Sequence, residues 1–160
     1  MQPAHLALLL LSALGPLAVR AEPARPMSES HARTLHGKMV HESEPTIRNA
    51  MQMAKGLDHS QSEYVYVNAI ADTSESANAA FDEFLTLAII YQRMRCPEDR
   101  SELRSWLPEN LKHAKAMLDI ALDTVNQALA NLTAPAVISE AQRLRGLLQF
   151  FREDLNRYSY

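Results

Sequence analysis

The stretch QSEYVYVNAIADTSESANAAFDEFLTLAIIYQRMR, residues 61–95, decides the fold of this chain. Its apolar and small residues recur at alternating spacings of three and four, which places them on one face of a helix. A capping-box pattern at Ser60-Gln-Ser-Glu63 precedes the stretch, and Cys96-Pro97 follows it. We therefore predict a helix over about 61–95, with a second capping box at 72–75 as the point where it would break. The shared face carries Val67, Ile70, Ser74, Ala77, Phe81, Phe84, Ala88 and Tyr91.

Two later segments repeat this spacing. One is predicted to be a helix from about Pro108 to residue 132, preceded by a short helix that ends near Trp106, with Trp106 covering the end of the bundle. The other is predicted to begin at Thr133 as its N-cap, with Pro135 in the first turn, where a missing N–H costs nothing. The two stripes are Leu111, Ala114, Leu118, Ala121, Val125, Ala128 and Leu132, and then Ile138, Ala141, Leu144, Leu148, Phe151, Leu155 and Tyr158.

A shorter apolar face follows Pro45 and completes a set of four helices. It is formed by Ile47, Met51, Ala54 and Leu57. Four amphipathic helices with short connections predict an all-α protein, an antiparallel up-and-down helix bundle that forms one domain over residues 44–160. Residues 22–43 carry few large apolar side chains, so we expect a mobile leader there, with at most one loose turn or helix after Ser28.

The first 21 residues have the pattern of a cleaved secretory signal peptide. Leu6 to Leu14 is an apolar run too short to span a bilayer, Gly15-Pro16 interrupts it, and Val19-Arg20-Ala21 offers a cleavage site. The sequence thus predicts an exported protein, periplasmic or secreted, with no integral membrane span after cleavage. Cys96 is the only cysteine, so no internal disulfide can form, which favours a bacterial periplasmic protein.

Charge and motifs narrow the classes of function. The chain has 16 Lys and Arg against 19 Asp and Glu, a formal net charge of −3, and the two signs are interleaved. This balance argues against nucleic acid as a partner. The sequence contains no G-x-S-x-G, no H-E-x-x-H and no phosphate-binding loop. We therefore expect a binding module rather than an enzyme, while a catalytic site assembled between helices stays open.

Soft and imidazole ligands gather in residues 27–59. The candidate metal ligands are His31, His36, Met39 and His41, and such groups suit copper or zinc. The three histidines recur every five residues, which turns each about 140° from the last on a helix. Because they cannot share one helical face, we expect no cofactor, and copper or zinc binding by this segment is the alternative.

Two pairs of apolar residues widen the predicted helical stripes. Ile89 and Ile90 broaden the face of the helix over 61–95, and Leu147 and Phe150 flank the stripe of the last helix. We interpret them as a candidate interaction surface for another protein or for a second copy of the chain. The alternative is that they only widen the core. The sequence thus predicts a non-catalytic protein-binding or envelope-associated module.

Overall fold

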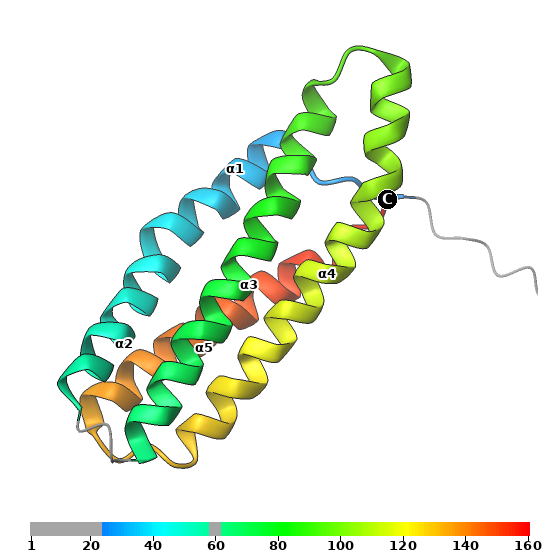
Figure 1. Ribbon diagram of the computed structural model, residues 1–160. Helices are drawn as coiled ribbons and strands as arrows, with labels where there is room; N and C mark the ends of the chain where they lie inside the picture. The colour runs from blue at the N-terminus through cyan, green and yellow to red at the C-terminus, as the bar shows by residue number, and fades with distance from the viewer. Residues whose placement is uncertain (1–23, 58–61) are drawn as a thin grey trace, which may run out of the picture.

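The computed structural model describes residues 24–57 and 62–160, and within these ranges it is helical apart from one antiparallel bridge between Arg25 and Ser159 (Figure 1). The predicted signal peptide lies outside the described residues. The elements are α1 (Glu29–Lys38), the π-helical turn η2 (Met39–Ser43), α2 (Glu44–Gly56), α3 (Ser62–Arg93), α4 (Pro97–Leu129) and α5 (Pro135–Leu155).

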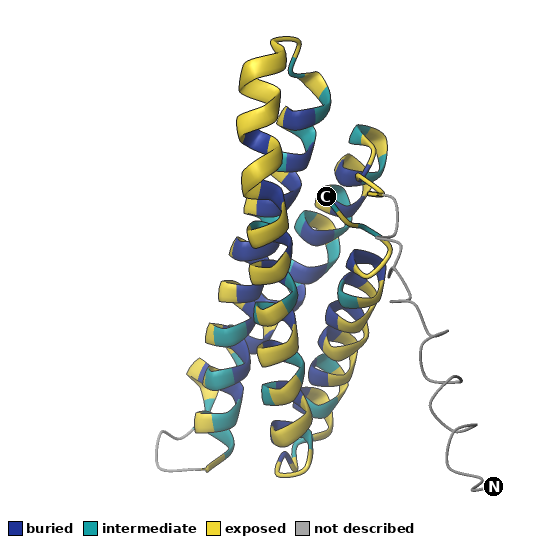
Figure 2. Cartoon of the chain, turned by 90° about the vertical axis from the view of Figure 1, so that its right-hand side faces the viewer, coloured by how far each residue is buried: buried dark blue, intermediate teal, exposed yellow. Residues whose placement is uncertain are grey.

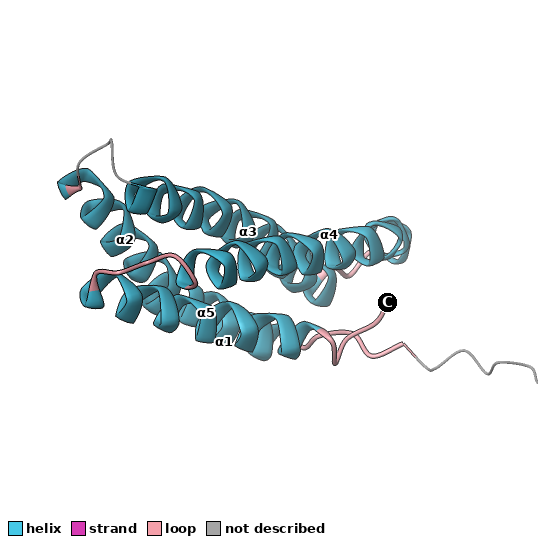
Figure 3. Ribbon diagram, turned by 90° about the horizontal axis from the view of Figure 1, so that it is seen from below, coloured by secondary structure: helices cyan, strands magenta, loops and turns pink. Residues whose placement is uncertain are grey.

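Four rods build the bundle, which confirms the predicted all-helical fold. Because α1, η2 and α2 follow one another without a gap, they form a single N-terminal rod. Figure 1 shows successive rods running in opposite directions, and Figure 3, a view from below, shows them lying lengthwise beside one another. The α3–α4 hairpin projects beyond the other rods at one end in Figures 1 and 2. Among the described residues, no helix combines the length and apolarity needed to cross a membrane.

The predicted stripes form the core. Figure 2 shows buried residues on the inward side of each rod and exposed residues on the outer side. Phe81 of α3 and Phe151 of α5 are fully buried, and their ring centroids lie 4.8 Å apart at the centre of the bundle. A tilted aromatic pair of this kind adds to the burial of apolar area. The core therefore joins rods that are far apart in the sequence.

The α3–α4 hairpin is more continuous than predicted. α3 does not break at 72–75, where the Thr73 side chain bonds within the helix and does not cap a new one: its Oγ1 donates to the Ala69 carbonyl at 2.8 Å. The prediction that a helix starts at Pro108 is wrong, since α4 begins at Pro97 and passes through Pro108. Pro108 is exposed while Leu107 before it is fully buried, so the core stripe continues past the proline and holds the helix together.

The start of α5 also differs from the prediction. Ala134, not Thr133, is the N-cap, and its side chain offers no cap. Glu63 at the start of α3 binds the residues just before α5, since its Oε1 accepts the backbone N–H groups of Ala134 at 2.9 Å and Thr133 at 3.1 Å. These bonds, the one from Ala134 first, hold the pKa of the Glu63 carboxyl below its ordinary value. A carboxylate from another rod thus fixes the residues that lead into α5.

The expectation of a mobile leader over 22–43 is wrong for residues 29–43, which are helical and contribute to the core. Met27 just before α1 is fully buried, and Leu35 and Met39 are 1% and 3% exposed. The sequence before residue 44 thus contains an apolar stripe, but the prediction missed it because the stripe has few large residues and its other members are small or polar.

Polar contacts from distant segments hold this N-terminal region in place. The Met27 N–H donates to Tyr160 Oη at 3.0 Å, and the Met27 carbonyl accepts from Gln92 Nε2 at 2.7 Å. Ser159 N also donates to the Arg25 carbonyl at 3.2 Å. The C-terminal residues thus fix the chain before α1, which sequence periodicity cannot reveal.

A proline explains the wide turn in the N-terminal rod. Pro45 lies in the first turn of α2 and would meet the carbonyl of the residue four positions earlier in a regular helix. The Glu44 N–H instead bonds to the Met39 carbonyl, the five-residue spacing of a π-helix. The rod therefore passes Pro45 without ending.

Candidate functional site

The structure distributes the four candidate metal ligands over different surroundings. His31 Nε2 lies 2.7 Å from Asp154 Oδ2, which ties α1 to α5. Asp154 is only 3% exposed, and Arg157 Nη1 lies 3.2 Å from its other oxygen. A buried carboxylate needs such partners. His31 therefore has a structural role in packing the first helix against the last.

The other three ligands do not join His31. His36 Nε2 lies 3.3 Å from Asp82 Oδ1 on α3, Met39 is buried in the core, and His41 is exposed. His31 and His41 are ten residues apart, about 15 Å along a helix axis. Within residues 24–57 and 62–160, no group of three or more His, Cys, Asp or Glu side chains is placed to hold a metal ion. Copper or zinc binding stays a prediction.

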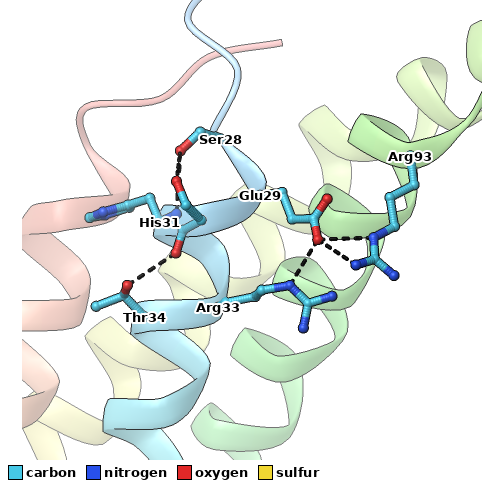
Figure 4. Close-up of polar contacts among 7 residues, drawn as sticks. Ser28, Glu29, His31, Arg33, Thr34 and Arg93 are labelled. Atoms are coloured by element: carbon cyan, nitrogen blue, oxygen red, sulfur yellow. Dashed lines mark hydrogen bonds and ion pairs between the residues drawn. The ribbon is translucent and has the colours of Figure 1, made fainter.

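A second polar contact fixes the start of α1 to the end of α3 (Figure 4). Glu29 Oε1 accepts from Arg33 Nε at 2.8 Å and from Arg93 Nη2 at 2.6 Å. The hydrogen bond from Arg93, followed by the one from Arg33, lowers the pKa of Glu29 to about 2. These contacts are structural, because they join the first turn of α1 to the last turn of α3.

The four residues predicted as an interaction surface do not form one patch. Ile90 is 41% exposed on α3 and Ile89 is half-buried, whereas Leu147 is 7% exposed and belongs to the core. Phe150 is 42% exposed on α5, with Lys38 Nζ 5.2 Å from its ring centroid. Because α5 packs on α2 and α4 while α3 packs on α4 and the N-terminal rod, Ile90 and Phe150 lie on different sides. For Leu147, the alternative of a wider core is correct.

Exposed apolar side chains concentrate instead on α3 and α4. Of the five large hydrophobic residues that are strongly exposed in the described ranges, only Phe150 lies elsewhere. Trp106, predicted to cover the end of the bundle, is 49% exposed on α4, because Leu103 and Leu107 already fill the core positions of that turn. The other three exposed residues are Val65 at 61%, Ile90 at 41% and Ile120 at 50%.

Helical spacing places most of these side chains beside the seam between α3 and α4. Trp106 and Ile120 are fourteen residues apart, close to four full turns, so they share one face of α4. Asp119 lies on the other flank of α4, where Arg152 of α5 binds it at 2.6 Å. On α3, Leu87 lies on the flank opposite Asp82, which faces the N-terminal rod. Both apolar flanks therefore border the seam on the outer side of the hairpin.

We call this surface the hairpin face. It comprises three residues of α4, two of α3 and one of the connection between the two helices. These are the exposed Trp106, Ile120 and Ile90 and the half-buried Met117, Leu87 and Met94. Sequence reasoning found Ile90 and missed the rest. The available signal was a second apolar stripe on α4, offset from the core stripe and marked by the fourteen-residue spacing of Trp106 and Ile120.

The opposite flank of α4 is charged. Arg152 of α5 makes a two-point contact with the Asp119 carboxylate, at 2.6 Å and 3.0 Å. Lys115, one turn before Asp119, has its pKa lowered by burial and then by the positive charge of Arg152. α4 thus presents a charged flank to α5 and an apolar flank to solvent.

Comparison with known proteins finds no family model, no curated protein and no solved structure that matches this chain.

Proposed function

We propose that this chain is an exported helix-bundle protein that acts by binding another protein through the hairpin face. The observation that carries the proposal is the exposure of Trp106 and Ile120 on one flank of α4 and of Ile90 on α3. Large apolar side chains gathered on one side of a protein are typical of interaction sites. The signal-peptide pattern in residues 1–21 supports export, with action at the envelope or outside it.

The composition of the surface fits a protein partner. Tryptophan is the residue type most enriched among those that dominate binding energy, and it acts best at the centre of an apolar patch with a polar rim. Trp106 is half-exposed and Met94 and Leu87 are partly buried, while the charged residues Glu83 and Glu109 are exposed on the two helices. An amphipathic helix of a partner would bury Trp106 and Ile120 along the seam between α3 and α4.

The test is site-specific photo-crosslinking in the producing cell. A photoreactive amino acid replaces Trp106 or Ile120 in one pair of strains and Gln142, an exposed residue of α5, in a control strain. We expect a discrete crosslinked polypeptide from the first two positions and none from Gln142. Mass spectrometry then distinguishes a second copy of this chain from a different protein.

A mutational comparison uses Phe150, which is exposed to a similar extent on α5. Trp106→Ser combined with Ile120→Ser is expected to lower capture of the crosslinked partner at least tenfold from a third hairpin position, Ile90, and Phe150→Ser is expected to leave it unchanged. Equal capture in both variants, or crosslinks that are no stronger at the hairpin than at Gln142, would contradict the proposal.

A further inference from the structure

A groove of about 380 Å³ opens between the N-terminal rod and α3, next to the π-helical turn. Its apolar part is formed by Met39 and Ile47, which are 3% and 2% exposed, together with Ala79 of α3. This volume lies within the range of about 300–1,000 Å³ that is typical of small-molecule sites. The groove is on the flank of α3 that faces away from the hairpin face, so its ligand does not depend on the proposed protein partner.

A buried amide with an unpaired donor lines this groove. Asn78 is 7% exposed, and its Oδ1 accepts a hydrogen bond from Ser43 Oγ at 3.1 Å. Its Nδ2 is buried and has no hydrogen-bond partner. A buried amide donor without a partner costs about 1–3 kcal/mol. The Asn78 Nδ2 donor is therefore free to bind an acceptor that enters the groove.

The charged residues of the groove are mostly acidic. Glu44, Glu75 and Asp82 line it with a single cation, Arg48. Glu44 and Glu75 make no ion pair with the residues that the structure describes. Asp82 Oδ1 is buried and makes no hydrogen bond, although His36 Nε2 lies 3.3 Å away. The groove thus has an excess of negative charge, which attracts a cation.

The arrangement suits an organic cation better than a metal ion. The acidic side chains of the groove and the neighbouring His36 do not form a cluster of three groups that could hold a metal. They surround an apolar surface, and a buried amide donor lies among them. A ligand with an ammonium group, a hydrogen-bond acceptor and a short aliphatic part satisfies all three features at once.

The geometry points to a binding site for a small organic amine in this groove, with its ammonium group between Glu44, Glu75 and Asp82, its acceptor on Asn78 and its aliphatic part against Met39 and Ile47. The π-helical turn contributes by placing Ser43 so that it holds Asn78 in position. π-helical turns inside α-helices are frequent at such sites.

The experiment is an NMR titration of the full mature chain with leucinamide, which carries an ammonium group, an amide carbonyl and an isobutyl group. At a pH of about 6.5 the amine is largely protonated. We expect saturable shifts of the Asn78 side-chain NH₂ signals and of backbone amides in 39–44 and 75–82. Two matched probes dissect the recognition: 3-methylbutylamine lacks the carbonyl, and 4-methylpentanamide lacks the ammonium group. Each is expected to bind at least fivefold more weakly than leucinamide.

Two variants localise the site without disturbing the core. Glu75→Gln removes one exposed carboxylate of the groove and is expected to weaken leucinamide binding at least threefold. Glu83→Gln removes an exposed carboxylate of α3 outside the groove and is expected to leave binding unchanged. The proposal is overturned if leucinamide gives no saturable shift up to about 20 mM, a limit that corresponds to negligible affinity. It is also overturned if both matched probes bind as well as leucinamide, or if Asn78 contacts only ordered water.

Discussion

The α3–α4 hairpin and the N-terminal rod are both long helical parts of this bundle, but different forces define them. The hairpin has a regular apolar stripe, and α4 continues through Pro108 because leucines before and after the proline are buried in the core. The N-terminal rod changes to a π-helical turn before Pro45 and depends on polar contacts at its start. A helix with a regular apolar stripe can therefore be predicted from sequence. A helix that depends on contacts with distant segments cannot be predicted in this way.

The difference also separates two kinds of surface. The hairpin carries apolar residues outside its core stripes, and these residues form the hairpin face. The N-terminal rod meets α3 through buried polar residues, with Ser43 of the rod bonded to Asn78 of α3. The apolar surface of the hairpin suits a protein partner, whereas the polar contact between the N-terminal rod and α3 suits a small polar ligand. The two regions therefore differ in their proposed functions as well as in what stabilises them.

The largest loss of stability is expected from the aromatic centre of the core. Phe81→Ala removes a fully buried ring that stacks on Phe151, and we expect the free energy of unfolding to fall by about 3–5 kcal/mol. Urea denaturation monitored by circular dichroism measures it. Phe150→Ala, which removes a half-exposed ring one position away from Phe151, is the control and should cost less than half as much.

Met27→Ala tests whether the segment before α1 belongs to the folded domain. Met27 is fully buried and its backbone bonds to Tyr160 and Gln92, so we expect a loss of about 2–4 kcal/mol in the same assay. Thr34→Ala on the exposed side of α1 should stay within about 0.5 kcal/mol of the parent chain. A loss for Met27→Ala as small as that of the control would mean that the segment before α1 is mobile and does not contribute to the stability of the bundle.

Pro108→Ala is expected to stabilise the protein. Proline inside a helix is about 3 kcal/mol less favourable than alanine, and part of this cost remains in α4 even though its neighbours are packed. We expect a gain of about 1–2 kcal/mol in urea denaturation. Pro45→Ala should gain less, because the π-helical turn already accommodates the ring. A larger gain in the free energy of unfolding for Pro45→Ala than for Pro108→Ala would show that the π-helical turn is itself strained.

Much of the bundle could be predicted from sequence, because burial follows spacing in α3 and α4. Val67, Phe81, Leu118 and Val125 all lie in the core as their stripes indicate. Capping could not be predicted in the same way. Thr133 has a typical N-cap side chain, yet Ala134 is the N-cap, and Glu63 from another rod binds the N–H groups of both residues.

The candidate sites were less accessible to sequence reasoning than the fold. Ile90 was identified as an exposed apolar residue, but Leu147 looked equivalent and is buried, because the flank of α5 that carries it packs against other helices. The sequence places Trp106 at the end of the bundle because Pro108 is typical of a helix start, whereas α4 runs through Pro108 without a break. The groove depends on the π-helical turn and on Asn78, and neither has a sequence pattern of its own.

The smallest expected effect is the pH dependence of the contact between α1 and the end of α3. The pKa of Glu29 is about 2 in the folded chain, lowered by Arg93 and then Arg33 from its ordinary value of 4.5. A lowered pKa means that the folded state favours the charged carboxylate, so this contribution to stability is present above pH 4.5 and is lost as the pH falls towards 2.

Glu29→Gln should therefore lower the thermal unfolding midpoint slightly at neutral pH, and the difference from the parent chain should shrink as the pH falls through this window. Glu83→Gln, an exposed change on α3, should show no such convergence. Because Glu29 is solvent-accessible at the end of the bundle, high salt should also reduce the difference at neutral pH. A difference that stays constant with pH and salt would mean that the glutamine disturbs packing, and that the N-terminal rod owes its position to buried contacts such as Met27 more than to this ion pair.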